Sequence, residues 1–388
     1  MKKFTAIFLA LVLVFTLACP VFAVHDNDSK TLKFNDDGKF KIMMINDVQD
    51  FDNPAKRSVE FINKALDSEK PDLVVFAGDQ LSDMFYTANY EKVKKALNNM
   101  IAPIEERDIP FLFTYGNHDH DRESAVSLAD QASFYYSYNS CYADKEGFAS
   151  GTYNKPIYSH DGSRVALNIY MMDTNNKDEN GGYSGVTAEQ VEWYKAKSDE
   201  LKAANGGEVV PSLLFQHIPV KEIYEFLLKS DSKDKNAVYS TVDHNWYTLN
   251  PDKMISETYV MGEAPCSEDL DKVTGQYQAW LEKGDIIGAY FAHDHLNNFV
   301  GKTSDGIIMG YNSGTGFSTY GNGGNRTVRM FVIDENDAAN YETYSVTYDS
   351  LTGSDNTLVF MDLLSPSVIT KLMRVVYFFF GGIIKMFK

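Results

Sequence analysis

The residues best suited to chemistry stand directly after short apolar segments. Residues 114–121 read TYGNHDHD and follow Ile109–Phe113, an apolar run that predicts a short buried strand. An amide, two imidazoles and two carboxylates crowd this turn, and Gly116 is expected to let the backbone turn sharply ahead of them. Similar positions at the ends of predicted strands are held by Asp47, Gln49, Asp79, Asn117, His118, His217, His293 and His295.

The elements that must position these residues alternate between strand and helix. The expected strands are Phe40–Ile45, Pro71–Ala77 and Ile109–Phe113, and the helices between them are Ser58–Leu66 and Tyr90–Ile104. This β-α-β-α-β order predicts a largely parallel sheet with helices on its faces. Because neighbouring parallel strands end at the same edge of a sheet, their polar side chains are expected to meet there.

The rest of the body predicts further strands and helices. A hairpin is expected over Tyr153–Met172, helices over Thr187–Ala204 and Gly275–Lys283, and strands over Pro211–Phe215, Ile286–Phe291, Ile307–Tyr311 and Val328–Ile333. Residues 131–160 are rich in Tyr and Ser without a clear period, and we interpret them as a surface excursion that either shapes a substrate cleft or is inert. Residues 230–266 are polar and insertion-like.

The collected donors are carboxylate, amide oxygen and imidazole, which suit metals such as Mn, Fe or Zn. No cysteine joins them, which argues against a structural zinc site. Their sequence blocks are DVQ at 47–49, GDQ at 78–80, GNHD at 116–119, QHIP at 216–219 and AHDHLNNF at 292–299. In this order the blocks resemble those of the calcineurin-like metallophosphoesterases, above all their purple acid phosphatase-like branch. The resemblance covers about residues 38–348 and includes GTGFSTYG at 314–321.

The resemblance implies an α/β fold, a metallophosphoesterase-type β-sandwich of two mixed sheets flanked by helices, with the catalytic domain over residues 33–350. It also implies a site for two divalent or trivalent metal ions (Mn, Fe or Zn), with Asp79 bridging both. One ion would add Asp47 and His295, with Gln49 as a further candidate, and the other would add Asn117, His217 and His293. A metal-bridging hydroxide, ionised at neutral pH, would attack phosphorus in line.

The same resemblance makes His118 a candidate catalytic residue, the general acid, with Asp119 helping to orient it. A metal ligand and a structural histidine are the alternatives for His118. His120 and Asp121 extend the block, and we interpret them as solvated loop residues. Asn298 either holds a ligand's ring or a phosphate oxygen, or is a turn residue.

Three positions depart from the family pattern. Gln49 stands where the family often has His, which implies weaker binding or a different ion on that side. Ala292 replaces a usual Gly, at small cost if its φ is negative. Ser82 or its neighbours stand where purple members carry a Tyr that binds ferric iron, so we expect no purple chromophore.

These features predict an exported, binuclear-metal-dependent phosphoesterase, a phosphoric ester hydrolase that acts on phosphomonoesters. One alternative is a phosphodiesterase acting on nucleotides or lipid head groups. Another is a metal-stabilised surface-binding protein without catalysis. The formal net charge of −18 repels nucleic acid backbones, so no nucleic acid binding is expected beyond a nucleotide as substrate.

The first 23 residues have the pattern of a cleaved export signal. Two lysines precede the apolar run Phe4–Leu17, and the segment ends in small residues at Ala23. A lipoprotein acylated at Cys19 and an uncleaved anchor are the alternatives. Cleavage predicts an extracellular or cell-surface location and leaves Cys141 and Cys266, which either pair or stay free.

Residues 351–388 form a tail of different character. Between 368 and 388 the chain carries four basic residues and no acid, and its apolar residues recur at helical spacing. The uncharged run Val375–Ile384 is too short to span a bilayer. The pattern predicts either an amphipathic helix lying on an anionic membrane surface or a terminal helix packed on the body.

Overall fold

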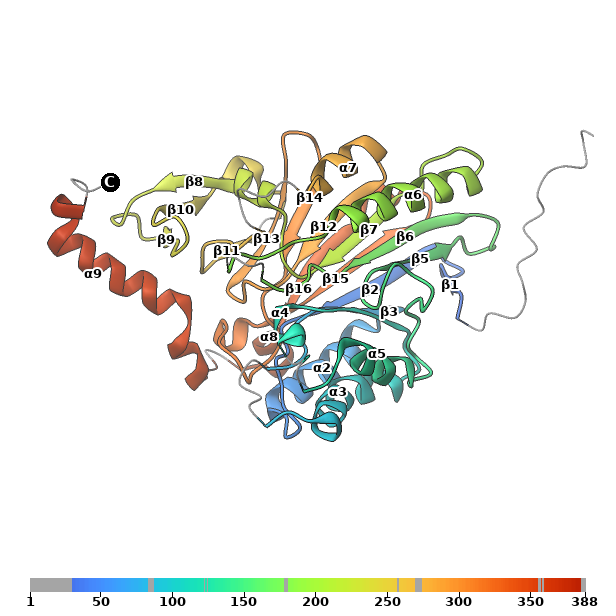
Figure 1. Ribbon diagram of the computed structural model, residues 1–388, viewed down its shortest axis with the longest axis horizontal. Coiled ribbons are helices and arrows are strands. Elements are labelled where there is room, and N and C mark those ends of the chain that lie inside the picture. Colours follow the sequence, from blue (N-terminus) through green and yellow to red (C-terminus); the bar gives the residue numbers. More distant parts are fainter. Residues whose placement is uncertain are drawn as a thin grey trace, which may run out of the picture. The chain divides into compact units, whose positions relative to one another are not determined.

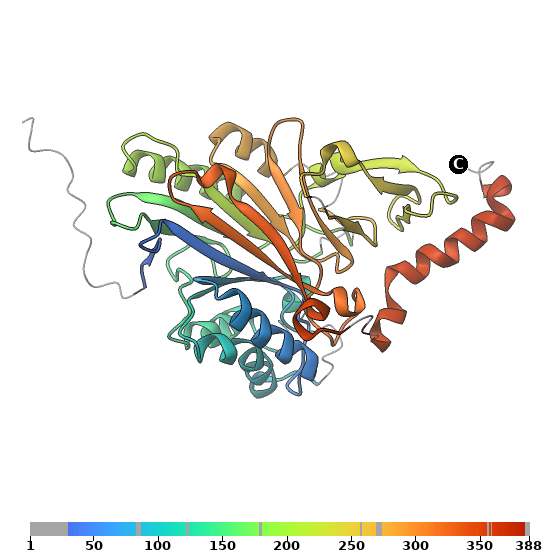
Figure 2. The ribbon, with the colours of Figure 1, turned by 180° about the vertical axis from the view of Figure 1, so that it is seen from behind.

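One layer of the fold is a five-stranded sheet in the order β16-β15-β2-β3-β4 (Figure 1). Its strands are β2 Lys39–Ile45, β3 Leu73–Ala77, β4 Phe111–Thr114, β15 Thr327–Asp334 and β16 Glu342–Thr347. β2, β3 and β4 are parallel, and β15 pairs antiparallel with β2. The connecting helices α2 (Lys56–Glu69) and α3 (Tyr90–Glu105) lie side by side on the outer face of this sheet (Figure 2). The expected β-α-β-α-β order is confirmed.

The second layer is an eight-stranded sheet in the order β1-β5-β6-β7-β12-β14-β13-β11. Its strands are β1 Leu32–Lys33, β5 Tyr153–Tyr158, β6 Val165–Met172, β7 Ser212–Gln216, β11 Val260–Met261, β12 Ile286–Phe291, β13 Asn297–Lys302 and β14 Ile308–Tyr311. β6, β7, β12 and β14 are parallel, and β5 and β6 form the expected hairpin. Helices α6 (Ala188–Ala204) and α7 (Gln276–Lys283) cover this sheet's outer face, where Tyr194 and Trp280 join a buried apolar cluster.

The two sheets face each other across the main hydrophobic core. The ring centroid of Phe331 on β15 lies 5.4 Å from that of Phe215 on β7 and 4.5 Å from that of Tyr290 on β12. Helices cover the outer sides, so the central strands are buried on both faces, which explains their continuous apolar runs. The computed structural model therefore confirms the expected β-sandwich of two mixed sheets flanked by helices.

The structure describes residues 30–82, 87–121, 123, 125–177, 181–256, 258–268, 274–354, 357 and 359–384. Residues 32–388 make one structural unit. The export signal expected over residues 1–23, with the alternative acylation site Cys19, lies outside the described residues. Cys141 and Cys266 are both free thiols, so the disulfide alternative is not realised.

The interpretation of residues 131–160 as a surface excursion is wrong. Helix α5 (Leu128–Tyr136) and strand β5 lie in this region, and their aromatic rings enter the core. Tyr135 stacks on Phe113 with ring centroids 4.0 Å apart, and the hydroxyl of Tyr153 donates to the carbonyl oxygen of Phe113 at 2.8 Å. Tyrosine hides this burial from a hydropathy pattern because its ring packs as an apolar group while its hydroxyl finds a partner.

The segment interpreted as an insertion, residues 230–266, contains most of a third, three-stranded sheet. Its strands are β8 Leu227–Ser230, β9 Val238–Tyr239 and β10 Trp246–Leu249, in the order β8-β10-β9. The C-terminal helix α9 (Pro366–Ile384) packs against β9. The remaining helical segments are α4 Asn117–His120, α8 Tyr348–Thr352, η1 Lys221–Phe226, η2 Pro251–Lys253, η3 Gly323–Asn325, η4 Ala338–Asn340 and η5 Phe360–Leu364. Within the described part of the chain, no helix combines the length and apolarity needed to cross a membrane.

Candidate metal centre

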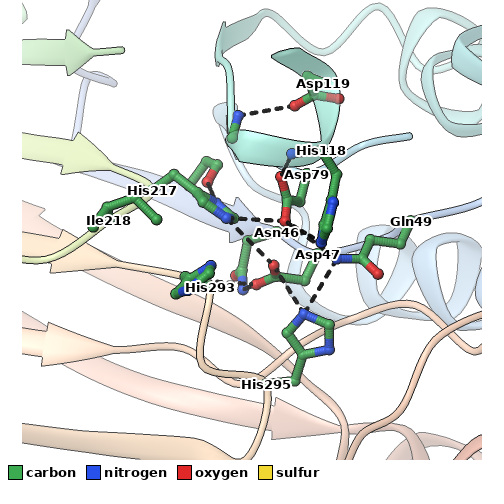
Figure 3. Close-up of polar contacts among 12 residues, drawn as sticks. Asn46, Asp47, Gln49, Asp79, His118, Asp119, His217, Ile218, His293 and His295 are labelled. Carbon is green, nitrogen blue, oxygen red and sulfur yellow. Dashed lines mark hydrogen bonds and ion pairs between the residues drawn. The ribbon is translucent and has the colours of Figure 1, made fainter. Parts of the chain in front are cut away.

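The predicted site residues labelled in Figure 3 lie close together, and Asn117 directly precedes His118 in the chain. They follow five strands: Asp47 and Gln49 come after β2, Asp79 after β3, Asn117 and His118 after β4, His217 after β7, and His293 and His295 after β12. Asp79, His217 and His293 each offer one ligand atom within 4.8 Å of the other two. Both sheets contribute, so the fold of the whole sandwich sets the geometry of this cluster.

The tautomer of His217 is fixed by the backbone. Its Nδ1 lies 3.0 Å from the carbonyl oxygen of Ala77, which can only accept a hydrogen bond, so Nδ1 carries the proton. In the neutral ring, Nε2 therefore presents a lone pair, and it lies 3.0 Å from Oδ2 of Asp79. Two lone pairs at this distance repel each other unless a proton or a metal cation lies between them.

The ring of His295 is set in the same way. Its Nδ1 lies 2.9 Å from the carbonyl oxygen of Tyr320, and its Nε2 lies 3.2 Å from Oδ1 of Asp47. The second carboxylate oxygen of Asp47 accepts hydrogen bonds from the Asn46 amide at 2.6 Å and from the backbone N–H of His293 at 3.1 Å. Asp47 is thus held by one oxygen and directs the other at two imidazoles (Figure 3).

The buried polar atoms of the cluster suit a bound cation. Asp47 Oδ1, Asn117 Oδ1 and His217 Nε2 are all buried and make no hydrogen bond. Buried polar atoms without partners are costly, so native proteins almost always satisfy them. Carboxylate oxygen, amide oxygen and neutral imidazole are metal ligands. The donor set present here therefore fits a metal ion.

The pKa values show how strongly these groups act on one another. Burial by itself lowers the pKa of His217, but the adjacent Asp79 carboxylate outweighs burial and raises it to about 10. Burial raises the pKa of Asp79, yet the neighbouring imidazoles, His217 foremost, hold it well below its usual range. For His293, burial and then the charge of His217 lower the pKa to about 3. Without a metal ion, a proton therefore lies between His217 and Asp79, where a cation would take its place, and His293 is neutral.

Backbone strain gathers at the same place. Asp47, Gln49, Asp79 and His293 have φ values of 50°, 44°, 53° and 73°, in the left-handed region that non-glycine residues seldom adopt. Such conformations cluster at functional sites, where the surrounding structure holds them. Ala292 does not have a positive φ, so its replacement of a glycine costs no backbone strain.

Gly116 serves the site through its lack of a side chain. Its φ of −112° is open to other residues, so the expected sharp turn is not its role. A Cβ added at Gly116 would lie 2.2 Å from Oδ1 of Asp79 and 2.6 Å from its backbone nitrogen. Only glycine allows the β4–α4 turn to approach the Asp79 carboxylate this closely.

His118 lies at the edge of the cluster, with about a quarter of its side chain exposed. Its Nε2 is 3.9 Å from Oδ2 of Asp79, and its backbone N–H donates to Oδ1 of the same carboxylate at 2.8 Å. Its Nδ1 lies 2.9 Å from Oδ2 of Asp121. The carboxylate that orients the His118 ring is therefore that of Asp121, which corrects the role expected for Asp119.

Asp119 has a different task. Its carboxylate accepts the backbone N–H groups of Gly116, Gln80 and Leu81 at 2.9 to 3.1 Å, and so joins the turns that follow β3 and β4. Burial and then the charge of Asp79 raise the pKa of Asp119 to about 7. It supports the backbone around Asp79.

Two other expectations from the sequence are corrected. The His120 side chain is only 8% exposed and lies between Glu123 and Asp173, with nitrogen–oxygen distances of 2.7 Å and 2.9 Å, so it is not a solvated loop residue. Asn298 lies in strand β13, where its Oδ1 accepts from Arg329 at 2.5 Å and from Ser345 at 2.9 Å. It is neither a turn residue nor a support for the His295 ring.

Gln49 turns its amide nitrogen toward the cluster. This nitrogen donates to Oδ2 of Asp79 at 3.2 Å and lies 3.4 Å from Nε2 of His295. A metal would need the amide oxygen, which a rotation of the amide group by half a turn would supply. In the arrangement observed, Gln49 acts as a hydrogen-bond donor to two candidate ligands.

A cavity of about 310 Å³ opens onto the cluster. Its walls include the candidate site residues Gln49, Asp79, His118, His293 and His295. Sequence reasoning did not single out two tyrosines that also line it. Tyr183 packs edge-on against His293 at 4.7 Å between ring centroids, and Tyr320 lies against His295. Tyr320 could have been identified from the sequence, because it lies within the block GTGFSTYG. No sequence motif marks Tyr183.

Comparison with known proteins identifies the family of this chain. Residues 40–297, well over half of the chain, match the sequence profile of the calcineurin-like phosphoesterase family. The chain therefore belongs to this family, as its blocks predicted.

Its relatives include purple acid phosphatases by name. Probable inactive purple acid phosphatase 14 of Arabidopsis thaliana is 27% identical over 351 residues, which cover 80% of this chain and 79% of that protein. Probable inactive purple acid phosphatase 29 of the same plant is 26% identical, covering 79% and 80%. A crystal structure of a dimetal phosphatase from Danio rerio is 13% identical, covers 80% of this chain and 99% of its own, and has a TM-score of 0.43.

Proposed function

We propose that this protein is a binuclear-metal-dependent phosphoesterase that hydrolyses phosphomonoesters, with Asp79 shared by two cations. The observation that carries the proposal is the orientation of two imidazole rings, those of His217 and His295. In each, Nδ1 donates to a backbone carbonyl and Nε2 is directed at a carboxylate, where a metal cation would replace the proton. A histidine whose other nitrogen donates to a carbonyl is the usual form of a metal-ligating histidine. The unpartnered buried oxygens of Asp47 and Asn117 complete the donor set.

The candidate ligands would be divided between two cations. One would be held by Asp79, Asn117, His217 and His293, and the other by Asp79, Asp47 and His295, with Gln49 joining after rotation of its amide. Bound Mn, Fe or Zn ions would supply an ionised water as nucleophile and positive charge opposite the phosphoryl oxygens.

Charge in the cavity supports a need for cations. The described residues that line it include the acids Asp79, Glu263 and Asp294 and no lysine or arginine. The ionised carboxylate of Asp79 would repel a phosphate ester, while burial raises the pKa values of Glu263 and Asp294 and so favours their neutral forms. Cations held by the same carboxylates reverse that repulsion, so metal binding and substrate binding are expected to depend on each other.

His118 is suited to protonate the leaving group of the reaction. Asp121 fixes its Nδ1, and its Nε2 faces the cavity beside Asp79. From there a protonated Nε2 would donate to the leaving alkoxide. Asp121 would keep the imidazole correctly turned.

A second candidate is a metal-stabilised binding protein without turnover. The amide nitrogen that Gln49 directs at the ligands favours it, because a donor at this position weakens the second metal site. Two of the relatives described above carry the word inactive in their names. Both candidates predict metal binding, so only turnover separates them.

The test is a panel of phosphate mono- and diesters assayed after chelator treatment and readdition of Mn, Fe or Zn. We expect monoester hydrolysis that disappears with chelator and returns with metal. The substitution Asp79→Asn should lower the turnover number roughly 1000-fold or more, since the bridging carboxylate would bind both ions. Full turnover by this variant would refute the catalytic site, and metal binding without hydrolysis of any ester would favour the second candidate.

Export is a separate part of the proposal and rests on the sequence alone. The lysines, the apolar run and the small residues that end at Ala23 support cleavage there. Mass spectrometry of the protein released by a secreting host should give a mature chain that begins at Val24. A chain that retains residues 1–23 would contradict cleavage.

A further inference from the structure

One face of helix α9 is fastened to the small third sheet. The guanidinium of Arg374 donates to the carbonyl oxygens of Asp234 at 2.5 Å and Ala237 at 2.6 Å. Tyr377 packs edge-on against Trp246 with ring centroids 5.8 Å apart. Arg374 and Tyr377 are three residues apart and so lie on the same face of the helix. That face is occupied by the protein itself.

The opposite face is apolar and exposed. Val368, Leu372, Val375 and Phe379 recur at intervals of three and four residues and are 42%, 60%, 54% and 68% exposed. In the preceding turn η5, the side chains of Phe360, Leu363 and Leu364 are also exposed. Among the described residues, more than half of the large apolar side chains that are exposed lie between 360 and 379. Such a concentration marks a surface that meets another apolar phase or a partner.

The charge around this face distinguishes between these occupants. The chain carries a net charge of −18, yet residues 366–388 contain four basic residues and no acid. Lys371 is exposed beside the apolar face. Of the other three, Arg374 lies on the occupied face, and Lys385 and Lys388 lie outside the described residues. An apolar face beside an exposed lysine, on a segment without acids in an otherwise acidic protein, is complementary to a layer of anionic lipid head groups.

The same helix is part of the catalytic cavity. Pro366 and Ile369 line the cavity that contains Asp79 and His118. A surface bound by α9 would therefore lie beside the mouth of the candidate active site. Ile369 and Val242 offer apolar contact in the same wall, where the alcohol part of a substrate with a hydrocarbon chain could lie.

We propose that the apolar face of α9 docks on an anionic lipid surface and that the adjoining cavity takes the phosphomonoester head of an amphiphile in that surface. The substrate part of this inference rests on the proposed phosphoesterase function. The docking part does not, because it depends only on α9.

Docking is tested by sedimentation of the full chain with vesicles of phosphatidylcholine, with and without about a third phosphatidylserine. We expect cosedimentation with the anionic vesicles only, and a loss of about tenfold or more in partitioning for the triple variant Leu372→Ser, Val375→Ser, Phe379→Ser. Val209→Ser replaces an exposed valine far from α9 in sequence and should leave binding unchanged. Failure of the wild-type chain to bind, or equal binding by the triple variant, overturns docking.

Catalysis at the surface is tested with phosphatidic acid in the same vesicles and with a soluble chromogenic monoester. The triple variant should lose vesicle hydrolysis about in proportion to its loss of binding while it keeps hydrolysis of the soluble ester. Equal losses on both substrates would overturn the inference. If neither ester is hydrolysed by the wild-type chain, the phosphoesterase proposal fails while sedimentation still decides docking. Self-association that is lost in the triple variant, without vesicle binding, would assign the face to a second copy of the chain.

Discussion

Tyr320 fixes His295 in two ways. Its ring stacks on the imidazole with centroids 4.2 Å apart and planes 12° from parallel, and its carbonyl oxygen accepts the Nδ1 hydrogen bond. The hydroxyl of Tyr320 in turn reaches Glu263 at 3.2 Å. One residue thus sets both the plane and the tautomer of a candidate ligand, so the loop after β14 is part of the candidate metal centre.

Tyr320→Leu should therefore weaken metal binding without abolishing it. The backbone carbonyl at position 320 remains in this variant, so the tautomer of His295 is kept. The plane of the His295 ring, however, is no longer fixed by stacking. We expect affinity for one of the two ions to fall about tenfold, as is usual when a residue that orients a metal ligand without binding the metal is replaced. Calorimetric titration of Mn²⁺ measures this, with Tyr90→Leu, an exposed tyrosine, as the matched control. An unchanged titration would show that the stacking has no role in binding.

His118→Asn should reduce turnover in a way that depends on the leaving group. A proton donor matters little when the leaving group is acidic and much when it is an alkoxide. We expect a loss of about tenfold for a nitrophenyl ester and about 1000-fold for an alkyl ester. His160→Asn, at an exposed histidine paired with Glu335, is the control. Equal losses for both esters would make His118 a binding residue instead.

Asp121→Asn and Asp119→Asn should have different effects. Loss of the Asp121 charge removes the contact that orients the His118 ring, so turnover of an alkyl ester should fall about tenfold while the free energy of unfolding changes little. Loss of the Asp119 charge weakens three backbone hydrogen bonds, so it should lower the free energy of unfolding by about 2 kcal/mol. Thermal unfolding of both variants and their turnover of an alkyl ester separate these roles. Identical behaviour of the two variants would contradict the assignment.

Gly116→Ala should damage the site more than the fold. The added Cβ would overlap Oδ1 of Asp79, so we expect a loss of metal affinity and of turnover of about 100-fold. Gly162→Ala is the control, because its φ is +75° but a Cβ there would meet nothing within 4 Å. That variant should cost about 1 kcal/mol of stability from backbone strain and leave metal binding intact. The reverse outcome would place the role of Gly116 in folding.

His120 makes stability depend on pH. Burial by itself lowers the pKa of its imidazole, but Asp173 and Glu123 outweigh burial and raise it from the ordinary 6.5 to about 9. The folded state therefore binds this proton more tightly than the unfolded state. The contribution is complete below about pH 6.5 and disappears as pH rises to about 9, with a maximum of about 3 kcal/mol. Urea unfolding in chelator should show a gap between wild type and His120→Gln that narrows over this range. A gap that is constant with pH would contradict the ion pair.

The strands whose two faces are both buried could be predicted from the sequence. β2, β3, β4, β7 and β12 read as continuous apolar runs because both sheets are covered, and each is followed by residues of the candidate site. The aromatic core around Tyr135 and Tyr153 was not predicted, because tyrosine does not count as an apolar residue in a hydropathy pattern and residues 131–160 show no clear period.

Local backbone geometry explains the misassigned partner of His118. Sequence adjacency suggested Asp119, but Asn117–His120 forms a helical turn, where residues three apart face each other and adjacent residues do not. Asp121 is three residues after His118 and makes the contact. The left-handed φ values of Asp47 and Asp79 could likewise not be predicted from the sequence, because no glycine stands at these positions.

The measurement that bears most directly on the central claim is a titration of chelator-stripped protein with Mn²⁺, in which bound metal and hydrolysis of a phosphomonoester are followed together. The account predicts two ions per chain, with turnover that rises as the second ion binds, and weakened binding of both ions in Asp79→Asn. A chain that hydrolyses the ester without metal, or an Asp79→Asn variant that still binds two ions with wild-type affinity, would contradict it.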